Sequence, residues 1–141
     1  MNIKVRTIPN SGLRFESSVM PREIGISEDF INEELPLNVS GLFERVGNFV
    51  LAKVEVTCGI ENHCARCLER ISRQETFKYD LEFELRPSDE FIDVGERLRE
   101  EMILAYLPRM LCRPDCKGIC PGCGAELNTE KCECDKNKTK E

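Results

Sequence analysis

Residues 77–86 have the sequence FKYDLEFELR, and this stretch decides the fold. Apolar and aromatic side chains occupy every odd-numbered position, and charged side chains occupy every even-numbered one. This two-residue period is typical of a β-strand with one buried face and one wet face. Residues 50–57 alternate in the same way, residues 37–42 begin an extended segment before them, and Gly47-Asn48 can form the turn between the two. The sequence therefore predicts an antiparallel sheet with one face toward water.

Downstream of this strand, the hydrophobic period lengthens to that of a helix. Val94, Leu98 and Met102 fall on one face, while the charged side chains between them lie elsewhere. Pro108 marks the stop, because proline cannot continue a helix. We therefore expect one amphipathic helix over about residues 94–107, followed directly by the cysteine-rich end of the chain.

Length and charge restrict the function classes. The chain has 141 residues and a mass of 16.2 kDa, enough for one domain and a small appended module. Its net charge of −6 arises in residues 1–108, which hold 13 basic and 20 acidic side chains, whereas residues 109–141 hold 7 and 6. Such an acidic surface repels a phosphate backbone, so any contact with RNA must be local or indirect.

The chain carries no pattern that points to a membrane. Its first residues do not resemble a signal peptide, and no apolar run approaches the roughly 18 residues of a membrane span. We therefore expect a cytoplasmic protein without membrane contact.

The nine cysteines need an explanation, because cytosolic thiols stay reduced and seldom form structural disulfides. Eight of them form four close pairs: Cys64 with Cys67, Cys112 with Cys116, Cys120 with Cys123, and Cys132 with Cys134. A short spacing lets a tight turn direct both sulfurs at one ion, and zinc prefers four thiolates in a tetrahedron. The spacing therefore predicts two zinc ions, while Cys58 remains outside the pairs as a small buried apolar residue.

We expect the pairs to combine into two closed sites. The first is predicted to comprise Cys64, Cys67, Cys112 and Cys116, and the second Cys120, Cys123, Cys132 and Cys134. The second resembles a compact zinc ribbon, although its closing Cys-x-Cys departs from the usual spacing. A different partition, with the four cysteines from 112 to 123 around one ion, is sterically conceivable, and so is partial occupancy. A closed tetrathiolate site offers no open position for catalysis, so we expect structural sites and no enzyme.

These patterns predict an α+β fold, mainly an antiparallel β-sheet with one amphipathic helix and a C-terminal zinc-ribbon-like cysteine module. We expect residues 1–108 to form an acidic sheet domain, residues 109–134 a cysteine-rich zinc module packed on it, and residues 135–141 a polar tail.

Other chemistries of the same cysteines remain open. The spacing of Cys116, Cys120 and Cys123 also occurs in iron-sulfur proteins, and Cys64-x-x-Cys67 can be a redox pair. A zinc donor or store is a further reading. His63, the only histidine, can replace a cysteine ligand but is better explained as a solvated neighbour.

The segment Cys64-Ala-Arg-Cys67-Leu68, the Leu107-Pro108 step and residues 111–128, LCRPDCKGICPGCGAELN, resemble the YceD family of large ribosomal RNA subunit accumulation proteins. The resemblance spans nearly the whole chain. In that family the middle Cys-x-Arg-Cys is the more general mark and the terminal cluster occurs in some members. This favours Cys64 and Cys67 sharing one site with Cys112 and Cys116.

The resemblance implies a role in accumulation of large-subunit ribosomal RNA, hence in ribosome assembly in a bacterial cytoplasm, and it brings no catalytic residue. Composition and spacing alone support only a small acidic zinc-binding module. Joined together, they suggest that an acidic sheet domain receives a basic ribosomal protein or assembly factor of the large subunit. The zinc-bound end would then approach RNA or fix the orientation.

Overall fold

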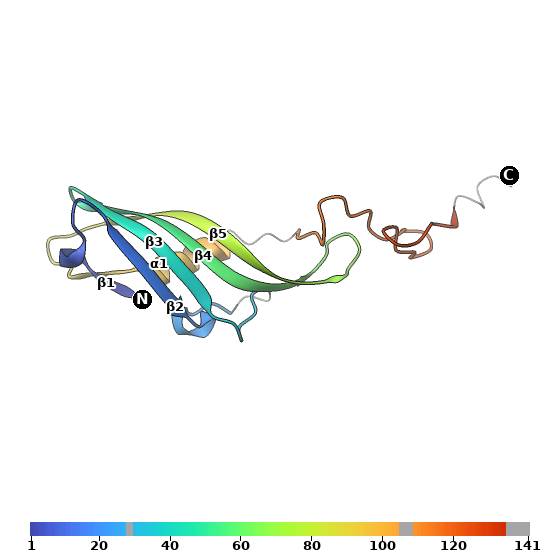
Figure 1. The fold of residues 1–141 in the computed structure, drawn as a ribbon, viewed down its shortest axis with the longest axis horizontal. Helices are drawn as coiled ribbons and strands as arrows, with labels where there is room; N and C mark the ends of the chain where they lie inside the picture. Colours follow the sequence, from blue (N-terminus) through green and yellow to red (C-terminus); the bar gives the residue numbers. More distant parts are fainter. Residues whose placement is uncertain (28–29, 105–108, 135–141) are drawn as a thin grey trace. The chain divides into compact units, whose positions relative to one another are not determined.

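The computed structural model describes residues 1–27, 30–104 and 109–134, and the chain divides into two compact units (Figure 1). The first unit comprises Met1–Ile60 and Arg73–Tyr106. The second comprises Glu61–Ser72 and Leu107–Glu141, so it unites a segment from the middle of the sequence with the cysteine-rich end.

Four strands build the main sheet, and they lie side by side in the order β2-β3-β4-β5 (Figure 1). Their bounds are Leu13–Val19, Leu37–Val46, Phe49–His63 and Arg70–Glu84. β3 pairs antiparallel with both β2 and β4, which confirms the predicted antiparallel sheet. Val46 pairs with Phe49, so Gly47 and Asn48 form the predicted two-residue turn. Gly47 has a φ of 61°, the left-handed value that such a hairpin turn requires.

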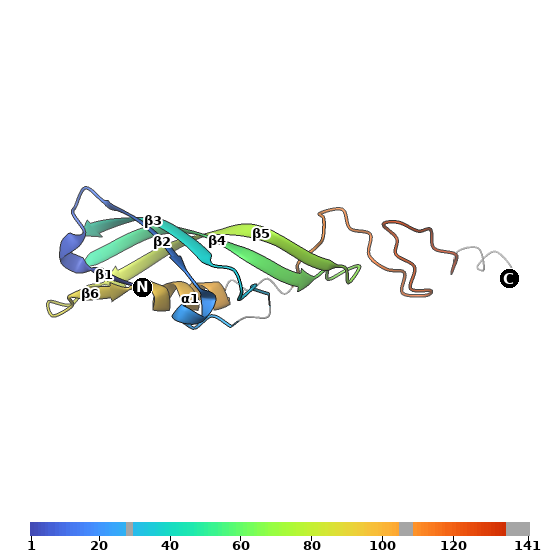
Figure 2. The ribbon, with the colours of Figure 1, turned by 60° about the horizontal axis from the view of Figure 1, so that its bottom comes forward.

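The core of the first unit lies between one face of the sheet and the helix α1, Val94–Leu104 (Figure 2). Alternate side chains of the strands point into it, and Phe43, Val50, Val56 and Leu81 are buried. From α1, the predicted apolar positions face the same core and are buried as well: Val94, Leu98 and Met102. The mainly antiparallel sheet with one helix and a cysteine-rich end is thereby confirmed for the described residues. The expected end of the helix and its stop at Pro108 lie outside them.

Short elements complete the first unit. β1, Asn2–Lys4, pairs antiparallel with β6, Phe91–Asp93, in a separate two-stranded sheet. Two 3-10 turns span Val5–Thr7 and Pro21–Ile24. The Asp93 carboxylate accepts the Glu96 N–H at 3.1 Å and so caps the first turn of α1.

The expected polar tail, residues 135–141, lies outside the described residues. Within the part of the chain that the structure describes, no helix has the length and apolar character needed to cross a bilayer.

Candidate metal centres

The first cysteine group gathers two segments that are far apart in sequence. Cys64 and Cys67 lie in the connection between β4 and β5, and Cys112 and Cys116 lie in the C-terminal segment. One sulfur from each comes within 4.8 Å of the other three. The Cys64 and Cys116 sulfurs are 3.7 Å apart, and those of Cys67 and Cys112 are 3.6 Å apart. The group thus joins the tip of a hairpin to the end of the chain within the second unit.

Backbone hydrogen bonds shape the turn that carries the first pair. Leu68 donates its N–H to the Cys64 carbonyl at 2.9 Å, and Cys64 donates to the Glu69 carbonyl at 2.8 Å. Ala65 donates to the Met110 carbonyl at 2.8 Å, which ties the hairpin tip to the C-terminal segment. These bonds bring the two sulfurs to one side of a tight turn.

Arg66, between the two cysteines of this turn, contacts the opposite segment twice. Its guanidinium Nη1 donates to the Cys116 carbonyl at 2.8 Å, and its own carbonyl accepts the Ile119 N–H at 3.2 Å. Arg66 therefore fixes the backbone beside Cys116. Hydrogen bonds to the main chain therefore hold the turn of Cys64 and Cys67 against the segment that carries Cys112 and Cys116.

The second cysteine group is local in sequence. Its sulfurs also lie within 4.8 Å of one another, and they belong to Cys120, Cys123, Cys132 and Cys134. The shortest separation, between Cys120 and Cys132, is 3.1 Å, and two others are 3.7 and 3.8 Å. Gly124 donates to the Cys120 carbonyl at 2.8 Å with a φ of 74°, the same turn that Leu68 closes in the first group. A bridge between Ile119 and Glu126 continues this turn as a short hairpin.

The sulfur separations fit one ion in each group. A Zn–S bond of about 2.3 Å gives a tetrahedron whose sulfur–sulfur edges are about 3.8 Å long. Four separations, two in each group, are close to this edge, between 3.6 and 3.8 Å. A disulfide would bring two sulfurs to about 2.05 Å, and all nine cysteines are free thiols. The donor set and its spacing therefore fit a closed tetrathiolate site.

Electrostatics also favours a cation, because four sulfurs this close cannot all ionise alone. Burial raises the pKa of the Cys64 thiol, but the backbone N–H groups around it outweigh burial and lower the pKa to about 6. Burial and the neighbouring thiols raise the pKa of Cys112 to about 12. In the second group, hydrogen bonding with Cys132 lowers the pKa of Cys120 to about 6 and raises that of Cys134 to about 12. Each group thus contains thiols of lowered pKa beside thiols of raised pKa, and a cation would favour the ionised form of all four.

The structure brings together the eight predicted cysteines in the two predicted sets, and not in the alternative set of residues 112–123. That they hold metal stays a prediction. His63 is exposed and belongs to neither group. Cys58 is buried in the first unit, where burial and then the Glu75 carboxylate raise the pKa of its thiol to about 11.

Sequence reasoning did not find Asn128. Its amide nitrogen donates to the Cys116 sulfur at 3.4 Å, and this bond is the main reason that the pKa of Cys116 is lowered. Asparagine in a cysteine-rich loop offers both a donor and an acceptor, but nothing in the spacing indicates which group it meets.

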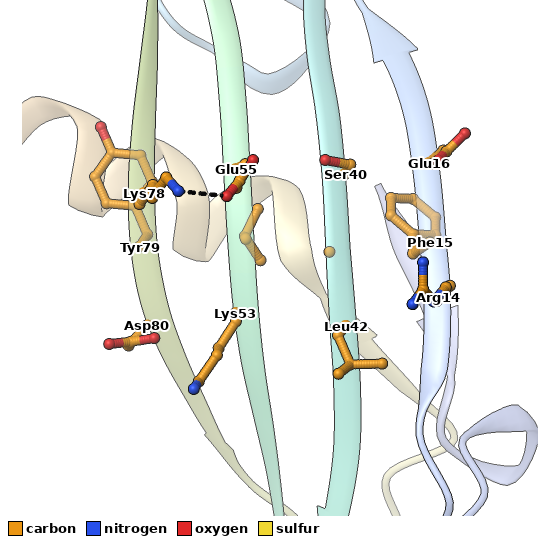
Figure 3. A pocket seen from close by; sticks show the side chains of 12 residues that line it. Arg14, Phe15, Glu16, Ser40, Leu42, Lys53, Glu55, Lys78, Tyr79 and Asp80 are labelled. Atoms are coloured by element: carbon orange, nitrogen blue, oxygen red, sulfur yellow. Dashed lines mark ion pairs between the residues drawn. The ribbon is translucent and has the colours of Figure 1, made fainter.

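A second region with polar side chains is the face of the main sheet opposite to α1 (Figure 3). A hollow of about 600 Å³ lies there across all four strands, and cations and carboxylates alternate along it: Arg14, Glu16, Lys53, Glu55, Lys78 and Asp80. Lys78 forms an ion pair with Glu55 at 2.8 Å. The hollow carries equal numbers of charges of both signs, so it favours neither a phosphate nor a metal cation.

At one end of this face, two apolar side chains are exposed among acidic ones. Leu42 and Leu51 are 38% and 40% exposed. A smaller hollow beside them, of about 310 Å³, is lined by the two leucines and by three carboxylates and one cation: Glu44, Asp80, Glu82 and Lys53. We call Leu42, Leu51, Glu44 and Glu82 the acidic sheet end.

Comparison with known proteins gives a family match. The family described as "Large ribosomal RNA subunit accumulation protein YceD" matches residues 52–141, a stretch that contains both cysteine groups. Proteins of Mycobacterium tuberculosis and Mycobacterium bovis, named only as uncharacterized, are 30% identical to this chain over 125 residues. The alignment covers 78% of this chain and 60% of theirs, so the chain spans about 60% of the length of these relatives.

Two plant proteins carry a functional name. "Large ribosomal RNA subunit accumulation protein YCED homolog 1, chloroplastic" of Zea mays is 40% identical over 48 residues, which is 33% of this chain and 16% of the plant protein. The Arabidopsis thaliana protein of the same name is 38% identical over 48 residues, 34% of this chain and 15% of that protein. No solved structure matches the chain.

Proposed function

This chain belongs to the YceD family, and from that premise we propose that it is a non-enzymatic zinc-binding factor that supports accumulation of large-subunit ribosomal RNA and thereby ribosome assembly. The observation that carries the proposal is the match over residues 52–141, because that stretch includes both cysteine groups. The plant relatives are named for the same role. The family description names accumulation of an RNA and no reaction, which agrees with a factor that binds and positions.

Each cysteine group would hold one zinc ion as a structural site. In the first, Cys64, Cys67, Cys112 and Cys116 would be the ligands, and in the second Cys120, Cys123, Cys132 and Cys134. When bound, the ion supplies folding free energy to a segment with few apolar side chains. The residues of the chain meanwhile set the turns and donate N–H groups to sulfur. Residues 109–134 would then form a zinc module together with the hairpin tip between β4 and β5.

The partner would be a basic protein of the large subunit or one of its assembly factors. The first unit holds 11 basic and 18 acidic side chains, and this excess attracts a basic partner while it repels phosphate. The second unit holds 9 basic and 8 acidic side chains, and two occupied tetrathiolate sites would add four negative charges. RNA contact would therefore be local or indirect, in a bacterial cytoplasm.

The acidic sheet end is the surface of the first unit that best suits such a partner. Leu42 and Leu51 offer apolar area, and Glu44 and Glu82 beside them select for lysine and arginine. Apolar contact with a charged rim is the usual composition of a protein interface.

A complementation experiment tests the proposed role. In a bacterium that lacks its own family member, the wild-type chain is expected to restore the ratio of large-subunit to small-subunit ribosomal RNA. The variant Cys64→Ser with Cys67→Ser is expected to fail, because it removes half of the first site. The variant Cys58→Ala is the matched control, since it removes a buried thiol that belongs to neither group, and it is expected to restore the ratio. An unrestored ratio with the wild-type chain would count against the role.

A pull-down separates a protein partner from RNA. Tagged chain is expected to enrich components of large-subunit precursors at low salt, and this enrichment should survive treatment with ribonuclease. Glu44→Gln with Glu82→Gln is expected to weaken it, while Glu96→Gln with Glu100→Gln on α1 is the control that changes the net charge by the same amount. Enrichment that disappears with the RNA would contradict a protein partner.

A cytosolic thiol redox protein or an iron-sulfur protein is the alternative. The closeness of Cys120 and Cys132, 3.1 Å, and the lowered pKa of Cys120 favour the redox version. An iron-sulfur cluster is less suited, because its four cysteines are divided between two irons or among four, so the four sulfurs stand farther apart than around one ion. A coloured protein, or a disulfide that forms and breaks without loss of structure, would support the alternative.

A further inference from the structure

Asn128 lies in the loop of the second cysteine group, but its side chain bonds to the first. The loop runs between Cys123 and Cys132, two ligands of the proposed second site. From there, the Asn128 amide reaches the Cys116-Lys117 step of the proposed first site. Asn128 is thus close in sequence to the ligands of the proposed second site, whereas its side chain contacts a ligand of the proposed first site.

The orientation of the Asn128 amide is fixed by chemistry. The Lys117 backbone N–H can only donate, and it lies 2.9 Å from Asn128 Oδ1. The other end of the amide, Nδ2, therefore faces the Cys116 sulfur at 3.4 Å, where it donates to a 2% exposed side chain. An N–H that points at a metal-bound thiolate stabilises the thiolate and fixes its direction.

The loop that presents Asn128 is held at both ends by the second group. At its start, Cys120 donates its N–H to the Ala125 carbonyl at 2.9 Å. In its middle, Leu127 donates to the Gly118 carbonyl at 2.9 Å. These main-chain bonds and the hairpin that begins at Cys120 place Asn128 opposite Cys116. The burial of apolar side chains gives little help, because the loop residues from 121 to 131 are half-buried or exposed.

We propose that the two metal sites are coupled, with Asn128 as the positioning residue that transmits the coupling. The proposal rests on the proposed metal binding. An ion at the second site closes the loop and delivers the Asn128 amide to Cys116, so the first site binds its ion more tightly. By linkage, an ion at the first site strengthens the second by the same factor.

A comparison with Arg66 separates this coupling from a contact that stabilises the first site whatever the state of the second. Arg66 holds the Cys116 carbonyl from the hairpin tip, which is not part of the second group. Replacing Arg66 is therefore expected to weaken the first site equally whether or not the second is occupied. Replacing Asn128 is expected to weaken the first site only while the second is occupied.

The test compares the overall affinity for two ions with the affinities of single sites. Co²⁺, whose thiolate complexes absorb visible light, is titrated against a competing chelator. Three proteins are needed: the wild-type chain, Cys132→Ser with Cys134→Ser, and Cys64→Ser with Cys67→Ser. The coupling factor is the overall binding constant of the wild-type chain divided by the product of the two single-site constants. We expect a factor of about 10 or more, the usual effect of a bond to a ligand.

The same three measurements are then made in the Asn128→Ala background. The coupling factor is expected to fall to about one, while the affinity of the second site alone stays unchanged. Asn128→Asp keeps the acceptor for the Lys117 N–H but replaces the donor to sulfur, so it should lose the coupling as well. Thr129→Ala is the matched control, because its hydroxyl bonds only to Glu126 within the loop. Circular dichroism reports whether each variant keeps its sheet.

The outcomes separate the two proposals. A wild-type chain that binds no ion contradicts the proposed metal sites themselves. Two ions bound with a coupling factor of one contradict the coupling alone. A factor that persists in Asn128→Ala shows that another contact carries it and overturns the role of Asn128.

Discussion

Three residues near the cysteines have a left-handed backbone, and their side chains decide what this geometry costs. Leu68, Gly118 and Gly124 have φ values of 64°, 76° and 74°. Glycine adopts this region without steric penalty, whereas a residue with a Cβ is strained there by about 1–2 kcal/mol. The turns after Cys67 and Cys123 therefore share one backbone shape, which Leu68 adopts in the first proposed site and Gly124 in the second.

Replacing Gly118 is expected to damage the first group more than strain alone would. A Cβ at this position would lie 3.1 Å from the Arg66 carbonyl oxygen, and that carbonyl is held in place by the Ile119 N–H. Gly118→Ala should lower the free energy of unfolding by about 2 kcal/mol or more, since left-handed strain and a contact with rigid backbone add up. Chelator-induced unfolding, followed by circular dichroism, measures the effect.

Gly124→Ala is the matched control, because its φ is nearly the same and nothing lies within 4 Å of its added Cβ. It should cost only the strain, about 1 kcal/mol. If the two alanine variants lose the same free energy of unfolding, the contact with the Arg66 carbonyl does not contribute to stability.

Leu68 offers the reverse test. Its side chain is 62% exposed, so little apolar burial is lost when it is removed. Leu68→Gly is expected to raise the free energy of unfolding by up to about 1 kcal/mol, because relief of left-handed strain exceeds the greater freedom of glycine in the unfolded chain. Thermal unfolding with metal bound measures it, and a clear loss of stability would show that the Leu68 side chain has a structural role.

At the scale of elements, the sheet is decided by which face each strand buries. Neighbouring residues of β3 point to opposite faces: Phe43 is fully buried with its ring 5.9 Å from that of Phe15, and Leu42 is 38% exposed. Truncating Phe43 should therefore lower the free energy of unfolding strongly, whereas truncating Leu42 should hardly change it.

Phe43→Ala is expected to lower the free energy of unfolding by about 3–5 kcal/mol, because it leaves a cavity in place of a fully buried ring. Leu42→Ala, one residue earlier, should change it by less than about 1 kcal/mol. Urea unfolding of both variants provides the comparison. Similar losses at the two positions would contradict the assignment of the faces.

The sequence predicted these strands where their pattern is regular and missed their length elsewhere. Alternation over residues 50–57 and 77–86, with the Gly47-Asn48 turn, predicted the first half of β4 and the second half of β5 because period two is set by local geometry. β4 nevertheless continues to His63, and β5 begins as early as Arg70. Residues 70–76 are mostly polar, so no hydrophobic pattern marks that extension.

At the scale of the whole molecule, the chain consists of an acidic sheet unit and a cysteine-rich unit. The grouping of the eight cysteines could be anticipated because close pairs favour chelation and the family resemblance linked the middle pair to the end of the chain. The contacts of Arg66 and Asn128 could not be anticipated, since they join segments whose meeting depends on the three-dimensional path.

Metal affinity is expected to depend steeply on pH. In the metal-free protein the thiols of Cys112 and Cys134 have a raised pKa of about 12, and those of Cys67 and Cys132 are raised too. These thiols hold their protons at neutral pH, so each ion should displace at least two protons. Affinity should therefore fall as the pH falls, and more steeply below the pKa of about 6 of Cys64 and Cys120.

Calorimetric titration in buffers of different ionisation enthalpy counts the protons released. Cys58→Ala should release the same number, because Cys58 belongs to neither group. Release of no protons would contradict coordination by these thiols.

The central claim is that eight cysteines hold two ions, one in each group of four. Native mass spectrometry of the purified chain tests it most directly. We expect two zinc ions per chain, with one remaining when Cys132 and Cys134 are replaced by serine. A chain that carries no metal, or whose mass shows the cysteines oxidised to disulfides, would contradict the account.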